Sequence, residues 1–149
     1  MPVMGAARFE RFFRMAASLD VDKSDLKRYD EFLDAKIHDL FVVAKATAKA
    51  NGRDVIEPSD LPVTKGLQER MHEFHKLDED LDVAPLIEQL LARPALEITI
   101  SEDTEARLPA IAGGLSVALA QAFKIIDPRV KNPGSAEWDH VFRMFELLL

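Results

Sequence analysis

Hydrophobic residues recur at helical spacing along most of the chain. Between Phe9 and Ala17 they lie three or four positions apart, which predicts a short first helix. The same rhythm holds from Leu26 to Ala50 and is broken on the inner face only at Lys36. The chain therefore begins with a short helix followed by a long central one.

The end of the long helix carries clear stop and start signals. Asn51 and Gly52 favour the left-handed conformation that terminates helices, and residues 54–56 read as a brief extended segment. Glu57, Pro58 and the following Ser and Asp are typical of a helix start, because proline suits the first helical position and acids suit the positive end. We expect a third helix from this point.

The second part of the chain repeats this plan. Residues 83–92 predict a short amphipathic helix, "LEITI" alternates like a strand, and Ser101 caps a second long apolar helix. The last predicted helix places one apolar face inward, formed by Trp138, Val141, Phe142, Phe145 and Leu148. The two patterns are offset by roughly 75 residues. We expect a single compact domain over 1–149, with a first half at 1–75, a linker at 76–85 and a second half at 86–149.

The segment "VVAKATAKANGRDVIEPSDLPVTKGL" resembles the second loop and flanking helices of archaeal histones. In that family a loop arginine is held against an aspartate of the following helix, and Arg53 and Asp60 have the matching spacing. A planar guanidinium can bind a carboxylate through two bonds, which lysine cannot do. The resemblance implies that Arg53 and Asp60 are a structural pair that locks the loop.

The whole plan resembles a small bacterial family of uncharacterised proteins that carry two histone folds in one chain. This resemblance implies an all-α fold, a tandem pseudo-dimer in which two histone folds form an intramolecular handshake. Pro62 is expected to split the third helix, and Pro109 and Gly113-Gly114 are expected to interrupt the second long helix. The second half should therefore be a distorted histone fold. The small residues around Gly113 are better explained by a close helix crossing than by a cofactor site.

The amino-acid composition indicates the cellular compartment and the kind of source organism. The absence of cysteine excludes disulfides and thiol catalysis and favours a reducing cytoplasm, with nucleoid association open. Arg8, Arg11 and Arg14 interrupt the N-terminal apolar run, so we expect neither a signal peptide nor a membrane span. Few asparagines and glutamines favour a thermophilic source.

The net charge of −7 argues against extensive nucleic-acid binding, which depends on Lys and Arg releasing phosphate counterions. Archaeal histones typically carry Lys-Thr after the loop Gly-Arg, whereas this chain has Asp54-Val55, and the other predicted loops are mostly acidic. The possible DNA contacts that remain are Arg8, Arg11, Arg14, Lys23, Lys27 and Arg28. They are either a small basic patch or an ordinary solvated surface.

Catalytic motifs are absent from the sequence. There is no glycine-rich phosphate loop, nucleophile elbow or convergent acid pair. His72 and His75 are the only weak metal candidate, and a polar helix surface explains them better. We therefore predict a non-catalytic histone-like protein without cofactor, membrane association or small-molecule substrate. It would act by binding a protein partner or itself; the alternative is a nucleoid protein that binds DNA through the basic patch.

Overall fold

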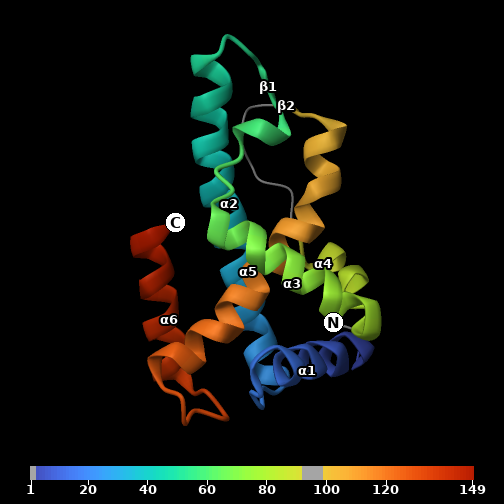
Figure 1. Ribbon diagram of the computed structural model, residues 1–149, viewed down its shortest axis with the longest axis vertical. Coiled ribbons are helices and arrows are strands. Elements are labelled where there is room, and N and C mark those ends of the chain that lie inside the picture. Colours follow the sequence, from blue (N-terminus) through green and yellow to red (C-terminus); the bar gives the residue numbers. More distant parts are fainter. Residues whose placement is uncertain (1–2, 92–98) are drawn as a thin grey trace.

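The computed structural model describes residues 3–91 and 99–149 (Figure 1). These residues form six α-helices, two short 3-10 helices and one pair of very short strands. In chain order they are α1 (Val3–Ala17), η1 (Lys23–Asp25), α2 (Leu26–Ala50), β1 (Val55–Ile56), η2 (Pro58–Asp60), α3 (Lys65–Leu81), α4 (Ala84–Leu90), β2 (Thr99–Ile100), α5 (Glu102–Ile126) and α6 (Ser135–Leu148).

The two 25-residue helices α2 and α5 cross in the middle of the molecule, and the other helices surround them (Figure 1). Their buried faces meet at a polar contact, where Tyr29 Oη and Ser116 Oγ lie 2.6 Å apart. Ser116 also donates to the carbonyl of Ala112 one turn earlier. Both hydroxyls are therefore satisfied inside an otherwise apolar core.

The predicted long central helix is confirmed with the same bounds, Leu26–Ala50. Asp22 and Asp25 form a capping box just before it, and Asn51 closes its last turn with backbone bonds to the preceding carbonyls. The first helix begins earlier than predicted, at Val3 instead of Phe9, because its inner face continues through the buried Ala6.

The third helix and the segment that follows it agree only in part with the prediction. A helical turn, η2, starts at Pro58 after Glu57, and the helix is split at Pro62 as expected, because Pro62 lies in the non-helical segment before the Thr64 cap. The α-helix itself therefore starts only at Lys65. The predicted linker 76–85 is largely helical, since α3 continues to Leu81 and α4 begins at Ala84. A left-handed Asp82, with φ of 51°, makes the turn between them.

The predicted interruption of the second long helix was also wrong. α5 runs continuously from Glu102 to Ile126 with Pro109 inside it. Gly113 and Gly114 are buried where α5 crosses α3, and a Cβ at Gly113 would overlap the Phe74 ring. The glycines therefore permit a close helix crossing instead of breaking the helix.

Candidate functional site

Arg53 and Asp60 meet side by side in the loop between α2 and α3. Arg53 donates from Nη1 to Asp60 Oδ2 at 2.5 Å and from Nη2 to Asp60 Oδ1 at 2.6 Å. Asp60 also accepts the Glu57 backbone N–H at 2.8 Å, and Arg53 donates to the Val55 carbonyl. Two charged side chains thus hold both strand β1 and helix η2 in place.

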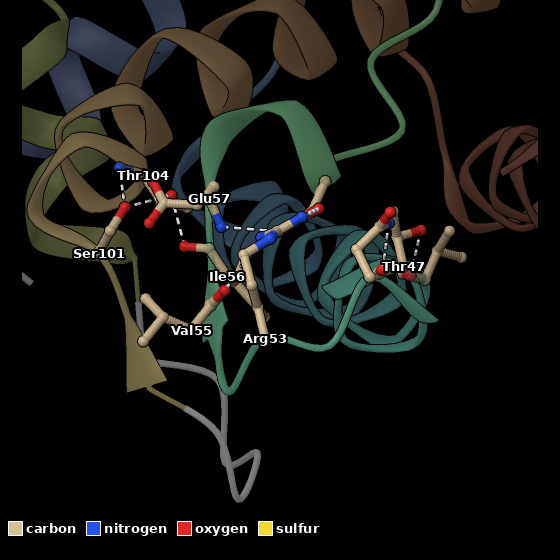
Figure 2. Close-up of polar contacts among 10 residues, drawn as sticks. Thr47, Arg53, Val55, Ile56, Glu57, Ser101 and Thr104 are labelled. Carbon is tan, nitrogen blue, oxygen red and sulfur yellow. Dashed lines mark hydrogen bonds and ion pairs between the residues drawn. The ribbon is translucent and has the colours of Figure 1, made fainter. Parts of the chain in front are cut away.

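The locked loop is joined to the start of α5 (Figure 2). β1 pairs in parallel with β2, and the carbonyl of Ile56 accepts both the Thr104 hydroxyl at 2.8 Å and the Ser101 backbone N–H at 3.1 Å. At another junction the Asp20 N–H donates to the Lys131 carbonyl at 2.5 Å. Each of these junctions joins an early loop of the chain to a late one.

The hydrogen bonds from Arg53 hold the pKa of Asp60 at about 2, below its usual range, and the Glu57 N–H acts in the same direction. A carboxylate with a lowered pKa stabilises the fold above its unfolded pKa, and this stabilisation is lost as the pH falls toward the folded value. We predict that Asp60→Asn is markedly less stable than the wild type at neutral pH. The stability gap should narrow between about pH 4 and pH 2, as wild-type Asp60 takes up its proton.

Urea unfolding of the wild type and of Asp60→Asn across this pH range measures the difference in their free energies of unfolding. Asp54→Asn is the matched control, because Asp54 is an exposed neighbour with no hydrogen bond or ion pair within the described ranges. A gap that stays constant with pH would show that Asp60 acts through packing and not through its charge.

Four of the six basic candidates for DNA contact have partners within the protein. Ion pairs form between Arg8 and Asp82 at 3.8 Å, Arg14 and Asp20 at 3.8 Å, and Lys27 and Glu31 at 3.9 Å. These distances and exposures are those of weak surface pairs, but they place a negative charge beside each cation.

Arg28 donates from Nη2 to Ser135 Oγ at 2.6 Å and so bridges α2 and α6. Arg11 and Lys23 are exposed, and neither side chain forms an ion pair or hydrogen bond in the part of the chain that is described. The candidates therefore lie on α1, η1 and the start of α2, and an acid pairs with three of them.

The loop ends carry further acids. Asp54 lies beside β1, and Glu102 and Asp103 follow β2. At the junction of Asp20 with Lys131, Asp22 and Asp127 are exposed next to the basic Arg129 and Lys131. Hydrogen bonds from Ser24 lower the pKa of Asp22, so this carboxylate holds its charge. Phosphate would meet repulsion from the acids around β1 and β2, whereas at the junction of Asp20 with Lys131 the acidic and basic side chains offset one another.

His72 and His75 are exposed on α3 and do not converge with acids. Among the described residues, no three histidine, aspartate or glutamate side chains form a group that could hold a metal ion. His75 instead packs beside the Phe74 ring, with ring centroids 6.1 Å apart. This arrangement offers no built metal site.

α5 is long and apolar enough to cross a membrane if only length and composition are considered. However, 56% of its most apolar window is buried within the described fold, where it packs against α3, α1 and α4. Its hydrophobic character is that of a core helix.

An exposed apolar face at the end of α5 and on α6 was not predicted from the sequence. Leu148 was predicted to point inward, yet it is 78% exposed, and its neighbours Leu147 and Ile125 are 85% and 77% exposed. Ile126 and Met144 complete this surface, which we call the α5–α6 face. The run "ELLL" and the pair Ile125-Ile126 could have indicated this face from the sequence. Consecutive residues of a helix point in different directions, so several apolar residues in a row cannot all face the core.

A groove lies beside this face, between α3, α5 and α6. Its lining is mostly apolar and includes Leu67, Leu115, Ala122, Phe145 and Leu148. A second hollow on the other side of α6 is lined by Ile126, His140, Arg143, Met144, Glu146 and Leu147. The α5–α6 face therefore combines projecting side chains with concave surfaces, a typical property of protein contact sites.

Comparison with known proteins places the chain among bacterial relatives. A crystal structure from Thermus thermophilus has 48% sequence identity and a TM-score of 0.84, with 97% of both chains covered. A 1.9 Å crystal structure from Aquifex aeolicus has 26% identity and a TM-score of 0.85, covering 97% of this chain and 95% of that one. An uncharacterised protein from Aquifex aeolicus (strain VF5) is 30% identical over 120 residues, which are 80% of this chain and 70% of the relative.

These relatives share the helical fold over nearly the whole chain. The family model described as a domain of unknown function, DUF1931, matches residues 9–146. The chain therefore belongs to the DUF1931 family.

Proposed function

We propose that the protein is a non-catalytic, histone-like scaffold that acts by binding protein through the α5–α6 face, with DNA binding weak or lost. The single observation that carries this proposal is the gathering of five of the eight large exposed apolar side chains of the described residues on that face: Ile125, Ile126, Met144, Leu147 and Leu148. Contiguous exposed apolar surface on a compact protein is typical of an interaction site.

The scaffold we propose is a handshake of two histone folds within one chain. Its support is the recurrence of a 25-residue helix between shorter ones, α2 between α1 and α3, and α5 between α4 and α6. In a handshake the loops at either end of one long helix pair with loops of the other fold. The β1–β2 pairing and the Asp20–Lys131 bond have this reciprocal form.

The alternative function, nucleoid DNA binding through the basic patch, is favoured by one observation, the exposure of Arg11, Arg14, Lys23 and Lys27 near one end of the fold. Electrostatic balance argues against it. Carboxylates at Asp20, Glu31 and Asp82 pair with three of the six basic candidates and so lower the positive charge that this surface presents. A surface with less positive charge releases fewer counterions from DNA.

Site-specific photo-crosslinking in cells that express the protein tests the proposal that the α5–α6 face binds protein. A benzophenone amino acid at Leu147 is expected to give covalent protein adducts, because this side chain projects from the α5–α6 face. The same probe at Glu79, an exposed position near the end of α3, is the matched control and should give none. Equal yields at both positions, or no adduct at Leu147, would contradict the proposal.

A further inference from the structure

The outward side of α6 carries an ordered pattern of side chains. His140, Arg143, Met144 and Leu147 recur at steps of three and four, so they form one stripe along the helix. Leu147 is the most exposed large apolar side chain of the described residues. It forms one edge of the hollow whose other lining residues are Ile126, His140, Arg143, Met144 and Glu146. A projecting side chain and a hollow thus occur on one surface.

The two flanks of this stripe differ in character. At about 100° per residue, Arg143 and Glu146 fall on one flank, whereas Met144 and Leu148 fall on the other. Arg143 and Glu146 are exposed, and neither has an ion-pair partner within residues 3–91 and 99–149. One flank is therefore charged, with one residue of each sign, and the other is apolar.

We propose that the partner of the α5–α6 face is a second copy of this chain, bound about a twofold axis with the two α6 helices antiparallel. This inference rests on the proposed function and names its partner. A twofold axis perpendicular to the helices brings each flank against the same flank of the other copy. Arg143 then faces Glu146 of the second copy, and the apolar flanks meet each other.

This register also places Leu147 in the hollow of the opposite copy. When the midpoint of the pairing lies between Met144 and Phe145, Leu147 reaches the level between His140 and Arg143 of the second copy. This is knobs-into-holes packing, and the twofold symmetry produces the same contact a second time, from the other copy. A parallel pairing would instead set the charged flank against the apolar flank, leaving both charges desolvated without partners.

The charge pattern selects a second copy over an unrelated partner. A uniformly basic or acidic partner would satisfy one of Arg143 and Glu146 and repel the other. Only a surface with the inverse order of signs satisfies both, and the same helix run in the opposite direction has that order. Self-complementarity of this kind defines an isologous dimer contact.

Sedimentation velocity of the full-length protein, from low micromolar to millimolar concentration, tests the proposal. We expect a monomer–dimer equilibrium that Leu147→Lys abolishes. Arg143→Glu and Glu146→Arg should each weaken dimerisation about tenfold or more, because each sets like charges opposite one another. The double variant Arg143→Glu with Glu146→Arg should restore the wild-type dissociation constant to within about threefold, since the pairing is then reversed but intact.

Arg107→Glu is the matched control, an exposed charge reversal on α5 beside η2, and it should leave dimerisation unchanged. Unchanged circular dichroism spectra verify that the variants fold. A monomer at every concentration, or a double variant as weak as the single ones, would overturn this inference. If photo-crosslinking at Leu147 then gave adducts with a different protein, the proposed protein-binding function would still hold. If it gave no adduct, both the dimer and the protein-binding function would be contradicted.

Discussion

Trp138→Ala is expected to lower the free energy of unfolding by about 3–5 kcal/mol, the range found when a buried tryptophan or phenylalanine is truncated. The Trp138 side chain is fully buried at the junction of three helices. Its ring packs edge-on against Phe123 of α5 at 4.9 Å between centroids and lies 6.2 Å from Phe13 of α1. Truncation would leave a cavity where α6 meets the rest of the fold.

The measurement is urea unfolding followed by far-ultraviolet circular dichroism, because Trp138 is the only tryptophan and its removal abolishes the fluorescence signal. Trp138→Phe is the control and should recover most of the loss, since a phenyl ring retains the aromatic contacts in a smaller volume. A cost below about 1 kcal/mol for Trp138→Ala would mean that α6 contributes little to the core.

Gly113→Ala is expected to destabilise the protein by about 1–3 kcal/mol, although alanine is the better helix former by about 1 kcal/mol. The added Cβ would overlap the ring of Phe74, which is itself buried, so the α3–α5 crossing must widen. Thermal and urea unfolding of the variant would show the loss.

Gly66→Ala is the matched control on α3. Its added Cβ would come no nearer than 4.0 Å to Thr64 Oγ1, so only helix propensity changes. We expect it to be neutral or to stabilise by up to about 1 kcal/mol. If both substitutions shifted stability in the same direction, close packing at Gly113 would not be the reason for glycine there.

Local signals predicted much of this fold. The bounds of α2 followed from apolar spacing and the Asn51-Gly52 stop, and the Ser101 cap marked the start of α5. The predictions failed where tertiary contacts outweigh local preference. Pro109 and Gly113 would weaken an isolated helix, but α5 is embedded among α1, α3 and α4, which hold it continuous.

The candidate site was predictable only where its residues are close in sequence. The bidentate contact of Arg53 with Asp60 spans seven residues and follows from the loop motif. By contrast, the pairing of Arg8 with Asp82 joins helices far apart in the chain, and no local pattern indicates it. The exposure of Leu147 and Leu148 likewise depends on which side of α6 the core occupies, which apolar spacing does not determine at a helix end.

We propose above all that this fold binds protein and not DNA. Fluorescence anisotropy of labelled duplex DNA, titrated with the full-length protein across a salt series, tests it most directly. We predict no micromolar binding near physiological salt, and at low salt only weak binding with a shallow salt dependence, because few phosphates are contacted. Micromolar binding at physiological salt with a steep slope, lost when Arg8, Arg11 and Arg14 are replaced by glutamate, would contradict the account and support the DNA-binding function.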